Sequence, residues 1–480
     1  SLISDLKIDP VKAFDWHKEF PKIFEKGGFD VVVGNPPYVD SETMVKFKPA
    51  ERQVLSQLYS AAIGNWDLFV IFIERAAQLV KNKGMVSMIV PNKLVASKYA
   101  VNIRQLLACK KLLSITDYSK VKVFDEANVY PCIFVLENEA AYGGINVCRM
   151  SSPENIYCTN TIDSQILRKE SYWDQFFVSQ QEKLLLQKIS RFTNLREYLP
   201  YIYGASTVAE AYLIKEKIVE FNNQKKPYKR FVNTGTIDRY TNLWNYRKTQ
   251  YIKDKYDAPI IFEDDIKTIN VTRHIQSASS KIIVAGMSLS PEAFYDKGCY
   301  IAGKSTTIIL GKEKILKFVL TILNSKLISF WFFKSFSSIA MAGGYLNIGV
   351  NELSMVPICD TPHKQPFVKL ANQIQLLHEN IKSLRQSFIE CLTDNFDKIK
   401  ITKKLIQFDK LEFKQFISEL KKQKIIIPIN RQLEWKEFFK NYQLQCQDIK
   451  QQITETDREI DQLVYELYGL TDEDIKIVCN

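Results

Sequence analysis

Four consecutive residues, Asn35-Pro36-Pro37-Tyr38, have the types and spacing that chemistry at an amine would need. An amide side chain offers an oxygen acceptor, prolines fix φ and hold the backbone rigid, and a tyrosine ring offers a flat face. The apolar run over 29–34 (FDVVVG) precedes them and predicts a buried strand that ends in a glycine turn. Because open α/β sheets bind ligands at the carboxyl ends of their strands, we expect the tetrapeptide to lie at such an edge.

In that setting the tetrapeptide resembles the catalytic motif of amino-methyltransferases, above all those that methylate adenine in DNA. The 6-amino group of adenine is a poor nucleophile because its lone pair is delocalised into the ring. The resemblance implies that the Asn35 side-chain oxygen accepts one of its hydrogens and the Pro36 carbonyl the other, so that the lone pair points at an incoming methyl group. Pro37 would keep the loop rigid, and Tyr38 would stack on a base extruded from the duplex. The alternative is a turn after a strand, with Tyr38 as core filler.

The sequence after the motif resembles the TaqI-type adenine methyltransferase family over a longer stretch. Asp67-Leu68-Phe69 and then 84–92 (GMVSMIVPN) follow in the order of that family's motifs. The segment 123–127 (VFDEA) resembles the family's eighth motif, where an aromatic side chain closes the far side of the flipped base. The resemblance assigns this role to Phe124, with Tyr130 as the second choice. The alternative is that Phe124 is a core residue before the next strand.

The chain departs from this family in its cofactor-binding half. Members bind S-adenosylmethionine with a glycine-rich loop and an acidic residue that both lie well upstream of the catalytic motif. Here only 34 residues precede Asn35, and they contain no G-x-G. We therefore expect an upstream polypeptide, or the preceding portion of a longer enzyme, to supply most of the cofactor site. Asn35 and Asp67, at the strand mouth, would lie nearest to the cofactor.

Apolar segments with the periods of strands and helices alternate up to residue 150, which predicts a mainly parallel α/β sheet with helical crossovers. Helices are expected over 66–81 and 97–108, and strands over 85–90, 112–118, 133–136 and 145–149. We predict that residues 1–150 form a partial methyltransferase catalytic domain, the second half of a Rossmann-like sheet.

We predict that residues 151–363 form a connector followed by a target-recognition domain. The pattern changes to short β-rich segments over about 198–358, and this stretch resembles the carboxyl-terminal specificity domain of the TaqI-type enzymes. The likeness is carried by 204–207 (GAST), 323–327 (LNSKL) and 343–346 (GGYL). Strands are expected over 260–262, 282–286 and 300–310, with a helix over 315–331. Such an α+β domain would read base edges with arginine and hold phosphates with lysine. The candidate DNA-binding residues, each of which could instead be a solvated surface residue, are Arg239, Tyr240, Lys281, Lys304, Ser305 and Tyr345.

Residues 364–480 have the apolar spacing of helices and predict a helical carboxyl-terminal region. Apolar residues recur at helical spacing over 370–384, a second stripe runs over 403–420, and Pro428 breaks the pattern. A long helix is expected over 433–468, with Gly469 as its C-cap. The simplest interpretation of these apolar stripes is that they pack against the recognition domain or against another helix. A dimeric coiled coil is the alternative.

Composition excludes several classes of protein. The chain carries a formal charge of +11, of which about +7 lies within 151–363; this fits a phosphate-binding surface or simply a lysine-rich composition. Nine cysteines form no C-x-x-C pair and four histidines show no ligand spacing, so no metal site is expected. No secretory signal and no membrane-spanning apolar run occur, which favours a cytoplasmic protein.

The function that these features favour is site-specific N6-methylation of a flipped adenine in double-stranded DNA, with S-adenosylmethionine as donor, in a restriction–modification or defence system. Two other functions stay open. A non-catalytic DNA-recognition subunit, or a relic, could keep a broken methylase half. A protein glutamine methyltransferase would use the same motif on an amide nitrogen, but such enzymes lack a long extension after the sheet.

Overall fold

The computed structural model describes residues 14–118, 121, 123–124, 130–152, 155–223, 225–336, 345–396 and 398–479. The chain forms two compact units. The first contains Ser1–Leu186 and Lys334–Tyr345, and the second contains Gln187–Phe333 and Leu346–Asn480. The three-domain division expected from the sequence stays a prediction.

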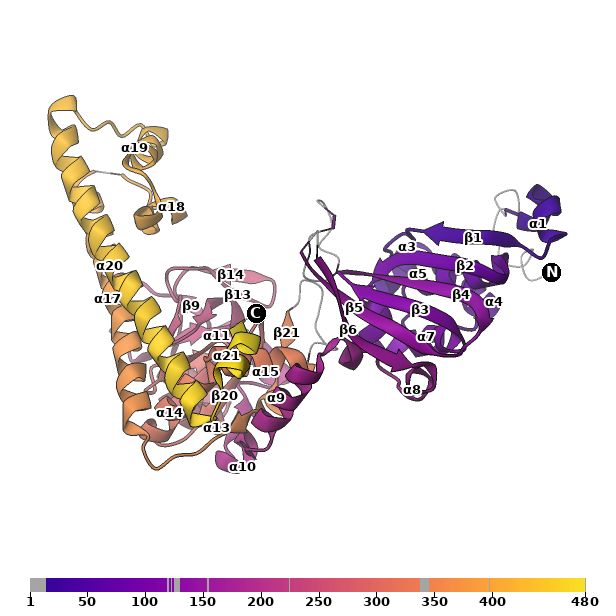
Figure 1. The fold of residues 1–480 in the computed structure, drawn as a ribbon. Coiled ribbons are helices and arrows are strands. Elements are labelled where there is room, and N and C mark those ends of the chain that lie inside the picture. The colour runs from indigo at the N-terminus through magenta and orange to yellow at the C-terminus, as the bar shows by residue number, and fades with distance from the viewer. Residues whose placement is uncertain are drawn as a thin grey trace. The chain divides into compact units, whose positions relative to one another are not determined.

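The first unit is built on a six-stranded sheet in the order β1-β2-β4-β3-β5-β6 (Figure 1). Its strands are β1 (Phe29–Gly34), β2 (Val80–Pro91), β3 (Lys110–Asp117), β4 (Pro131–Ala140), β5 (Gly144–Ser152) and β6 (Asn155–Asp163). Only β1–β2 and β3–β5 pair in parallel, so the expectation of a mainly parallel sheet is wrong. Helical crossovers separate β1, β2 and β3, but among the described residues no helix separates β3 from β4, β4 from β5 or β5 from β6, and such neighbours pair antiparallel where they meet.

Helices on the sheet complete the core of the first unit. The expected helices are present as α5 (Phe69–Leu79), against β2, and α7 (Val101–Ala108), against β3. Trp66 and Trp173 are both fully buried in this core. The remaining helical elements are α1 (Trp16–Glu19), α2 (Pro21–Phe24), α3 (Ser41–Phe47), α4 (Pro49–Leu58), α6 (Lys93–Ala96), η2 (Lys98–Ala100), α8 (Ser164–Lys169), η3 (Asp174–Phe177) and α9 (Gln180–Ser190), which runs into the second unit.

The second unit opens with two four-stranded sheets, ordered β19-β10-β15-β9 and β18-β16-β20-β8. Their strands are β8 (Ile202–Gly204), β9 (Val219–Glu220), β10 (Tyr228–Val232), β15 (Pro259–Phe262), β16 (Lys281–Ala285), β18 (Ala293–Asp296), β19 (Tyr300–Ala302) and β20 (Thr306–Leu310). Short two-stranded pairs are formed by β7 (Thr193–Asn194), β11 (Ile237–Asp238), β12 (Thr241–Asn242), β13 (Thr249–Tyr251), β14 (Asp254–Tyr256), β17 (Met287–Ser288), β21 (Leu346–Asn347) and β22 (Pro357–Ile358). Helices here are α10 (Leu195–Tyr198), η4 (Thr234–Thr236), α11 (Val208–Lys217), α12 (Glu263–Ile269), α13 (Val271–Ala278), α14 (Glu313–Leu323), α15 (Lys326–Phe336), which ends in the first unit, and α16 (Val350–Ser354).

The single helix expected over 315–331 is two helices, α14 and α15, bent by 65°. The break falls at Asn324, the residue after α14. Its side chain forms hydrogen bonds with the backbone of a strand. Its amide donates to the Ala293 carbonyl (2.9 Å) and its side-chain oxygen accepts from the Ala293 N–H (3.1 Å). No single helix among the described residues is long and apolar enough to cross a membrane, and α14 with α15 pass that test only as a bent pair.

A helical hairpin follows, formed by α17 (Gln365–Asn395) and α20 (Ile429–Leu467) lying side by side (Figure 1). Between them the continuous stripe expected over 403–420 is broken into α18 (Lys403–Ile406), η6 (Phe408–Lys410) and α19 (Phe413–Lys422). These elements enclose a separate aromatic core around Phe388, which stacks on Phe408 with ring centroids 3.7 Å apart. Gly469 follows α20 at φ 65°, which confirms the expected C-cap, and α21 (Asp472–Cys479) ends the described chain.

Candidate active site

The Asn35 loop leaves the carboxyl end of β1, the edge strand of the first sheet. Gly34 lies opposite Met88 of β2, and a Cβ at this position would approach the Met88 side chain to 3.2 Å, so glycine lets the two strands stay close at the loop. Asn35 is exposed and Pro36 is buried. Within the described residues, neither the Asn35 side-chain amide nor the Pro36 carbonyl has a hydrogen-bond partner. No described residue therefore occupies either predicted acceptor.

The structure brings the two predicted aromatic residues together. The Tyr38 and Phe124 rings meet edge to face, with centroids 5.9 Å apart and planes at 75°. The Tyr38 hydroxyl donates to the Ile89 carbonyl at 3.4 Å, a long bond, and burial raises the pKa of Tyr38 to about 12. Tyr130 is half-buried, and its carbonyl accepts from the Asn92 N–H (2.7 Å). Residues 125–127 of the predicted aromatic motif lie outside the described residues.

Asp67 anchors the chain just after the Asn35 loop. Its buried carboxylate accepts from the Ser41 N–H (3.0 Å), the Tyr99 hydroxyl (2.8 Å) and the Lys93 ammonium (2.9 Å). The Leu68 N–H also donates to the Val39 carbonyl (2.9 Å). Burial, and then the Asp67 charge, raise the pKa of Tyr99, which therefore stays a hydrogen-bond donor. Asp67 thus positions the Asn35 loop with three of its lone pairs, while its predicted contact with the cofactor stays a prediction.

A second layer holds the loop that leads to Asp67. The Glu74 carboxylate accepts from the Ser60 N–H (3.0 Å) and the Ala61 N–H (2.8 Å). Arg52 donates to the carbonyls of Trp66 and Gly64, at 2.9 Å each, and its guanidinium lies over the Trp66 ring. The sequence interpretation missed Arg52, Ser41, Lys93 and Tyr99. The signal for Lys93 was its place directly after the strand that ends in Pro91-Asn92, where side chains reach the sheet edge.

The residues at the carboxyl end of β1 fit only part of a cofactor site. Asn35 offers an exposed amide with free hydrogen-bonding capacity at the carboxyl end of β1. Residues 14–28, directly before that strand, form the short helices α1 and α2 and an aromatic cluster around Phe29 rather than a phosphate- or ribose-binding loop. Among the described residues, no group of three or more His, Cys, Asp or Glu side chains could hold a metal ion.

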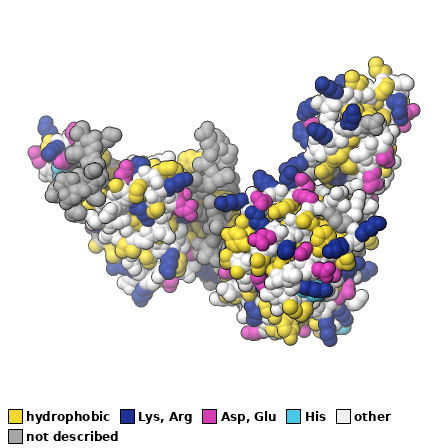
Figure 2. Space-filling view, turned by 180° about the vertical axis from the view of Figure 1, so that it is seen from behind, with side chains coloured by type: hydrophobic (Ala, Val, Ile, Leu, Met, Phe, Trp, Pro, Cys, Tyr) yellow, Lys and Arg dark blue, Asp and Glu magenta, His cyan; other side chains and the backbone are white. Residues whose placement is uncertain are grey.

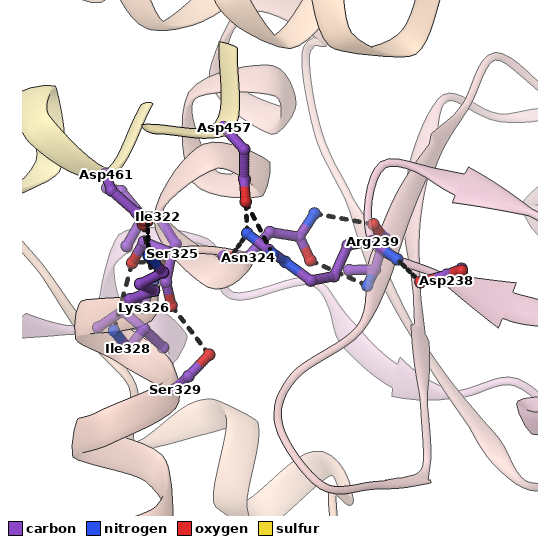
Figure 3. Close-up of polar contacts among 11 residues, drawn as sticks. Asp238, Arg239, Ile322, Asn324, Ser325, Lys326, Ile328, Ser329, Asp457 and Asp461 are labelled. Atoms are coloured by element: carbon purple, nitrogen blue, oxygen red, sulfur yellow. Dashed lines mark hydrogen bonds and ion pairs between the residues drawn. The ribbon is translucent and has the colours of Figure 1, made fainter. Parts of the chain in front are cut away.

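Arg239 binds the helical hairpin (Figure 3). Its guanidinium makes two parallel bonds to the Asp457 carboxylate of α20, at 3.0 and 2.6 Å, and a third to the Asn324 carbonyl at 2.5 Å. Four residues further along α20, Asp461 accepts from the Lys326 N–H at the start of α15 (2.8 Å). The guanidinium group that could pair with guanine is therefore already hydrogen-bonded inside the second unit. Arg239 links the sheets of the second unit to the hairpin.

The other predicted DNA-binding residues fall into a buried group and an exposed group. Lys281 is 1% exposed and forms an ion pair with Asp296 (2.5 Å), and Tyr240 is 2% exposed. The prediction that these two contact DNA does not fit, because a side chain that solvent cannot reach cannot reach a phosphate. Lys304 and Ser305 are exposed in the turn between β19 and β20, and Tyr345 is exposed before β21. Residues 343–344 of the predicted recognition motif lie outside the described residues.

Fold and loop together define a class: the second half of a methyltransferase sheet with an Asn-Pro-Pro-Tyr loop, followed by a recognition domain and a helical region. Family models match in the same order. Residues 3–124 match the Eco57I restriction-modification methylase, residues 230–358 match the TaqI-like C-terminal specificity domain, and residues 360–464 match a domain of unknown function. The resemblance predicted from the sequence is confirmed: the chain carries a restriction-modification methylase segment and a TaqI-like specificity segment.

Two curated relatives agree with this assignment. The chain is 26% identical over 221 residues to the type II restriction enzyme and methyltransferase RM.Eco57I of Escherichia coli, covering 45% of this chain and 22% of that protein. It is 23% identical over 404 residues to the putative type II restriction enzyme and methyltransferase RM.MjaORFECS2P of Methanocaldococcus jannaschii, covering 81% of this chain and 32% of that protein. The type IIL restriction-modification enzyme MmeI, solved in complex with DNA, aligns over 98% of this chain and 57% of its own, with 12% identity and a TM-score of 0.38. The chain thus spans about a fifth to a third of the curated relatives' length.

Proposed function

We propose that this chain supplies the catalytic loop and the recognition domain for N6-methylation of adenine at specific sites in double-stranded DNA, with S-adenosylmethionine as donor, in a restriction–modification system. The observation that carries the proposal is a pair of oxygen acceptors at the carboxyl end of β1, on Asn35 and Pro36, that accept no hydrogen bond from the described residues. The family matches over the same segment support it. The DNA substrate would place the protein in the cytoplasm.

In this mechanism the chain orients an amine and does not need a general base. The Asn35 side-chain oxygen and the Pro36 carbonyl accept the two N6 hydrogens, so that the nitrogen lone pair is directed out of the ring plane. When bound, S-adenosylmethionine supplies a methyl group on a positively charged sulfur. The oriented N6 nitrogen would accept that methyl group, and its extra proton would pass to water. Asp67 keeps the loop in place through Ser41.

Tyr38 and Phe124 would hold the extruded adenine between them. An aromatic base needs about 3.5 Å to each neighbouring ring face, or about 7 Å between the two rings. The two rings meet edge to face at 5.9 Å, which leaves no room for a base. Base binding therefore requires that Phe124 rotate away from Tyr38 and then return onto the far face of the adenine.

The open edge of β1 supports the proposal that another polypeptide segment contributes the cofactor-binding half. Within the described residues β1 pairs with β2 alone, while Val31 and Val33 on β1 are 56% and 75% exposed. An edge strand with exposed apolar side chains is a template for a further strand. Titration of the chain with S-adenosylmethionine, alone and with a candidate upstream polypeptide, tests this: binding only in the mixture supports it, and binding to the chain alone contradicts it.

Product analysis tests the proposed function itself. The completed enzyme is incubated with labelled S-adenosylmethionine, duplex DNA and a protein extract, and the DNA is then digested to nucleosides. We expect the label in N6-methyladenine. Label in another base would contradict the adenine assignment, label in glutamine would favour the protein methyltransferase, and no transfer with intact DNA binding would favour a recognition subunit or relic.

A further inference from the structure

The end of the helical hairpin carries a concentrated positive charge. We define the hairpin tip as residues 396–440, which include α18, η6, α19 and the start of α20. It contains 12 Lys and Arg against 6 Asp and Glu, a net charge of +6 in a chain whose total is +11. The region 364–480 as a whole is nearly neutral, because the α20 stem and the carboxyl-terminal helix are acidic, while the α17 stem is neutral. The tip is therefore a local basic module, and Figure 2 shows Lys and Arg side chains over this lobe.

The structure turns the basic side chains of the tip outward and buries two of its carboxylates. Asp409 is fully buried and accepts from Arg385, by two bonds of 2.9 Å, and from Lys450. Glu419 is buried between Lys404 (3.4 Å) and Lys422 (2.6 Å). All 12 basic residues of the tip are exposed. Nine of them have no ion-pair partner among the described residues: Lys398, Lys400, Lys403, Lys410, Lys414, Lys421, Lys424, Lys436 and Lys440.

These lysines are mounted on a folded lobe rather than on a tail. Phe388 of α17 is fully buried and contacts the rings of Phe408, Phe416 and Phe439. The Asp409 carboxylate joins α17 to α20, because Arg385 and Lys450 come from the two stems. An array of ammonium groups fixed in this way loses less conformational entropy on binding than one on a disordered segment.

We propose that the hairpin tip binds the phosphate backbone of duplex DNA beside the base pairs that the specificity domain engages. This inference rests on DNA being the partner of the proposed function. The free groups are lysines, which bind phosphates as point charges and carry no sequence information. From Asp457, which holds Arg239, to Trp435 in the tip core, α20 rises about 33 Å at 1.5 Å per residue, which corresponds to about 10 base pairs at 3.4 Å each. The tip therefore contacts DNA up to about one helical turn from the specificity domain.

Salt-dependent binding tests the proposal without knowledge of the target site. Fluorescent duplexes of arbitrary sequence, 12 and 36 base pairs long, are titrated with the full chain by anisotropy over 50–300 mM salt. In the triple variant Lys414→Gln/Lys421→Gln/Lys424→Gln, each lost phosphate contact lowers the slope of log K against log salt by about 0.9, so a decrease of up to about 2.7 is expected on the 36-mer. The decrease is expected to be smaller on the 12-mer, which is too short to engage both surfaces.

A matched control removes the same charges elsewhere in the second unit. Lys297, Lys312 and Lys314 are exposed at the end of β18 and β20 that lies away from the Lys304 turn, and Lys→Gln at all three is expected to leave the slope unchanged. The opposite change, Glu434→Gln/Glu437→Gln, removes exposed acids from the tip and is expected to tighten binding, which misfolding would not do.

An unchanged slope in the tip variant, or an equal decrease in the control, overturns the proposal. Weaker binding after Glu434→Gln/Glu437→Gln also overturns it. This failure is distinct from failure of the proposed function, since methyl transfer is assayed separately. If adenine is methylated but the tip variant keeps the salt slope of the parent, only DNA binding by the tip is refuted. If the tip variant has a smaller salt slope but no methyl is transferred, only the proposed methylation is refuted.

Discussion

Asp67→Asn should loosen the catalytic loop. The carboxylate has an oxygen for the Ser41 N–H on one side and an oxygen shared by Tyr99 and Lys93 on the other. An amide has one oxygen, so one of these sides must face an NH2 group. Bonds to a charged acceptor contribute about 1 kcal/mol more than neutral ones. Two buried bonds therefore lose about 2 kcal/mol, and the Lys93 pair, whose side chain is 45% exposed, adds about 0.5 kcal/mol or less.

Hydrogen exchange followed by mass spectrometry measures this effect locally, which suits a chain of two units whose global unfolding is not two-state. A loss of 2 to 2.5 kcal/mol predicts about 30- to 60-fold faster exchange over residues 38–44, at 1.4 kcal/mol per factor of ten. Asp30→Asn is the matched control, because Asp30 is an exposed acid at the other end of β1. We expect this variant to leave the exchange rate over residues 38–44 unchanged. Unchanged exchange in Asp67→Asn together with a loss of methyl transfer would refute the positioning role and favour direct contact with the cofactor.

Three further predictions concern the second unit. Phe388→Ala should destabilise the hairpin tip by about 3–5 kcal/mol, because it empties a fully buried aromatic core, and exchange over 396–440 should speed up while the recognition sheets are protected as before. Arg239→Lys should cost about 1.5–3 kcal/mol by loss of the two-bond pair with Asp457 and leave the preferred DNA sequence unchanged; a relaxed sequence preference would show that Arg239 reads bases after all. Burial, and then the charge of Asp238, raise the pKa of Glu292 to about 7, so the folded state favours its neutral form: its contribution to stability is fully present below pH 4.5 and is lost as the pH rises through 7. In Glu292→Gln, the free energy of local opening around residue 292, measured by hydrogen exchange over pH 4–8, should no longer fall as the pH rises. A pH profile like that of the parent would contradict the burial argument.

The sequence predicted where the Asn35 loop begins, because the determinants of the preceding strand are local. The apolar run and the glycine predict a strand, and the structure has it at Phe29–Gly34. It is an exposed edge strand rather than the buried strand expected, and residues 35–38 follow it as irregular backbone rather than as a turn. The resemblance also chose Phe124, 86 residues beyond Tyr38, and the structure places the two rings in contact. Long-range pairing was harder to foresee. The antiparallel insertion of β4 between β2 and β3 depends on the tertiary fold, and a mainly parallel sheet was expected there.

Charged and polar side chains were predicted least well, since their partners come from distant parts of the chain. Lys281 and Arg239 look like surface residues in the sequence, but Asp296 and Asp457 hold them inside the second unit. Asn324 reads as part of one helix, although its bonds to Ala293 end α14. Averaging the charge over 364–480 hid the basic tip, because the acidic residues that follow it in 441–480 offset its charge in the sum.

The measurement that tests the central claim most directly compares methyl transfer and DNA affinity in Asn35→Ala, within the completed enzyme. Removing one of two preorganised acceptors is expected to lower the transfer rate by about 10²–10³-fold, as for single groups in comparable electrostatic sites. DNA affinity should stay within about twofold of the parent, since the variant loses one contact to the extruded adenine and leaves the phosphate and base contacts proposed for the second unit unchanged. Asn82→Ala, an exposed asparagine of β2, serves as the control that should change neither quantity. Equal losses of transfer and affinity, or a transfer rate like that of the parent, would contradict the role of Asn35 as the acceptor that activates the amine.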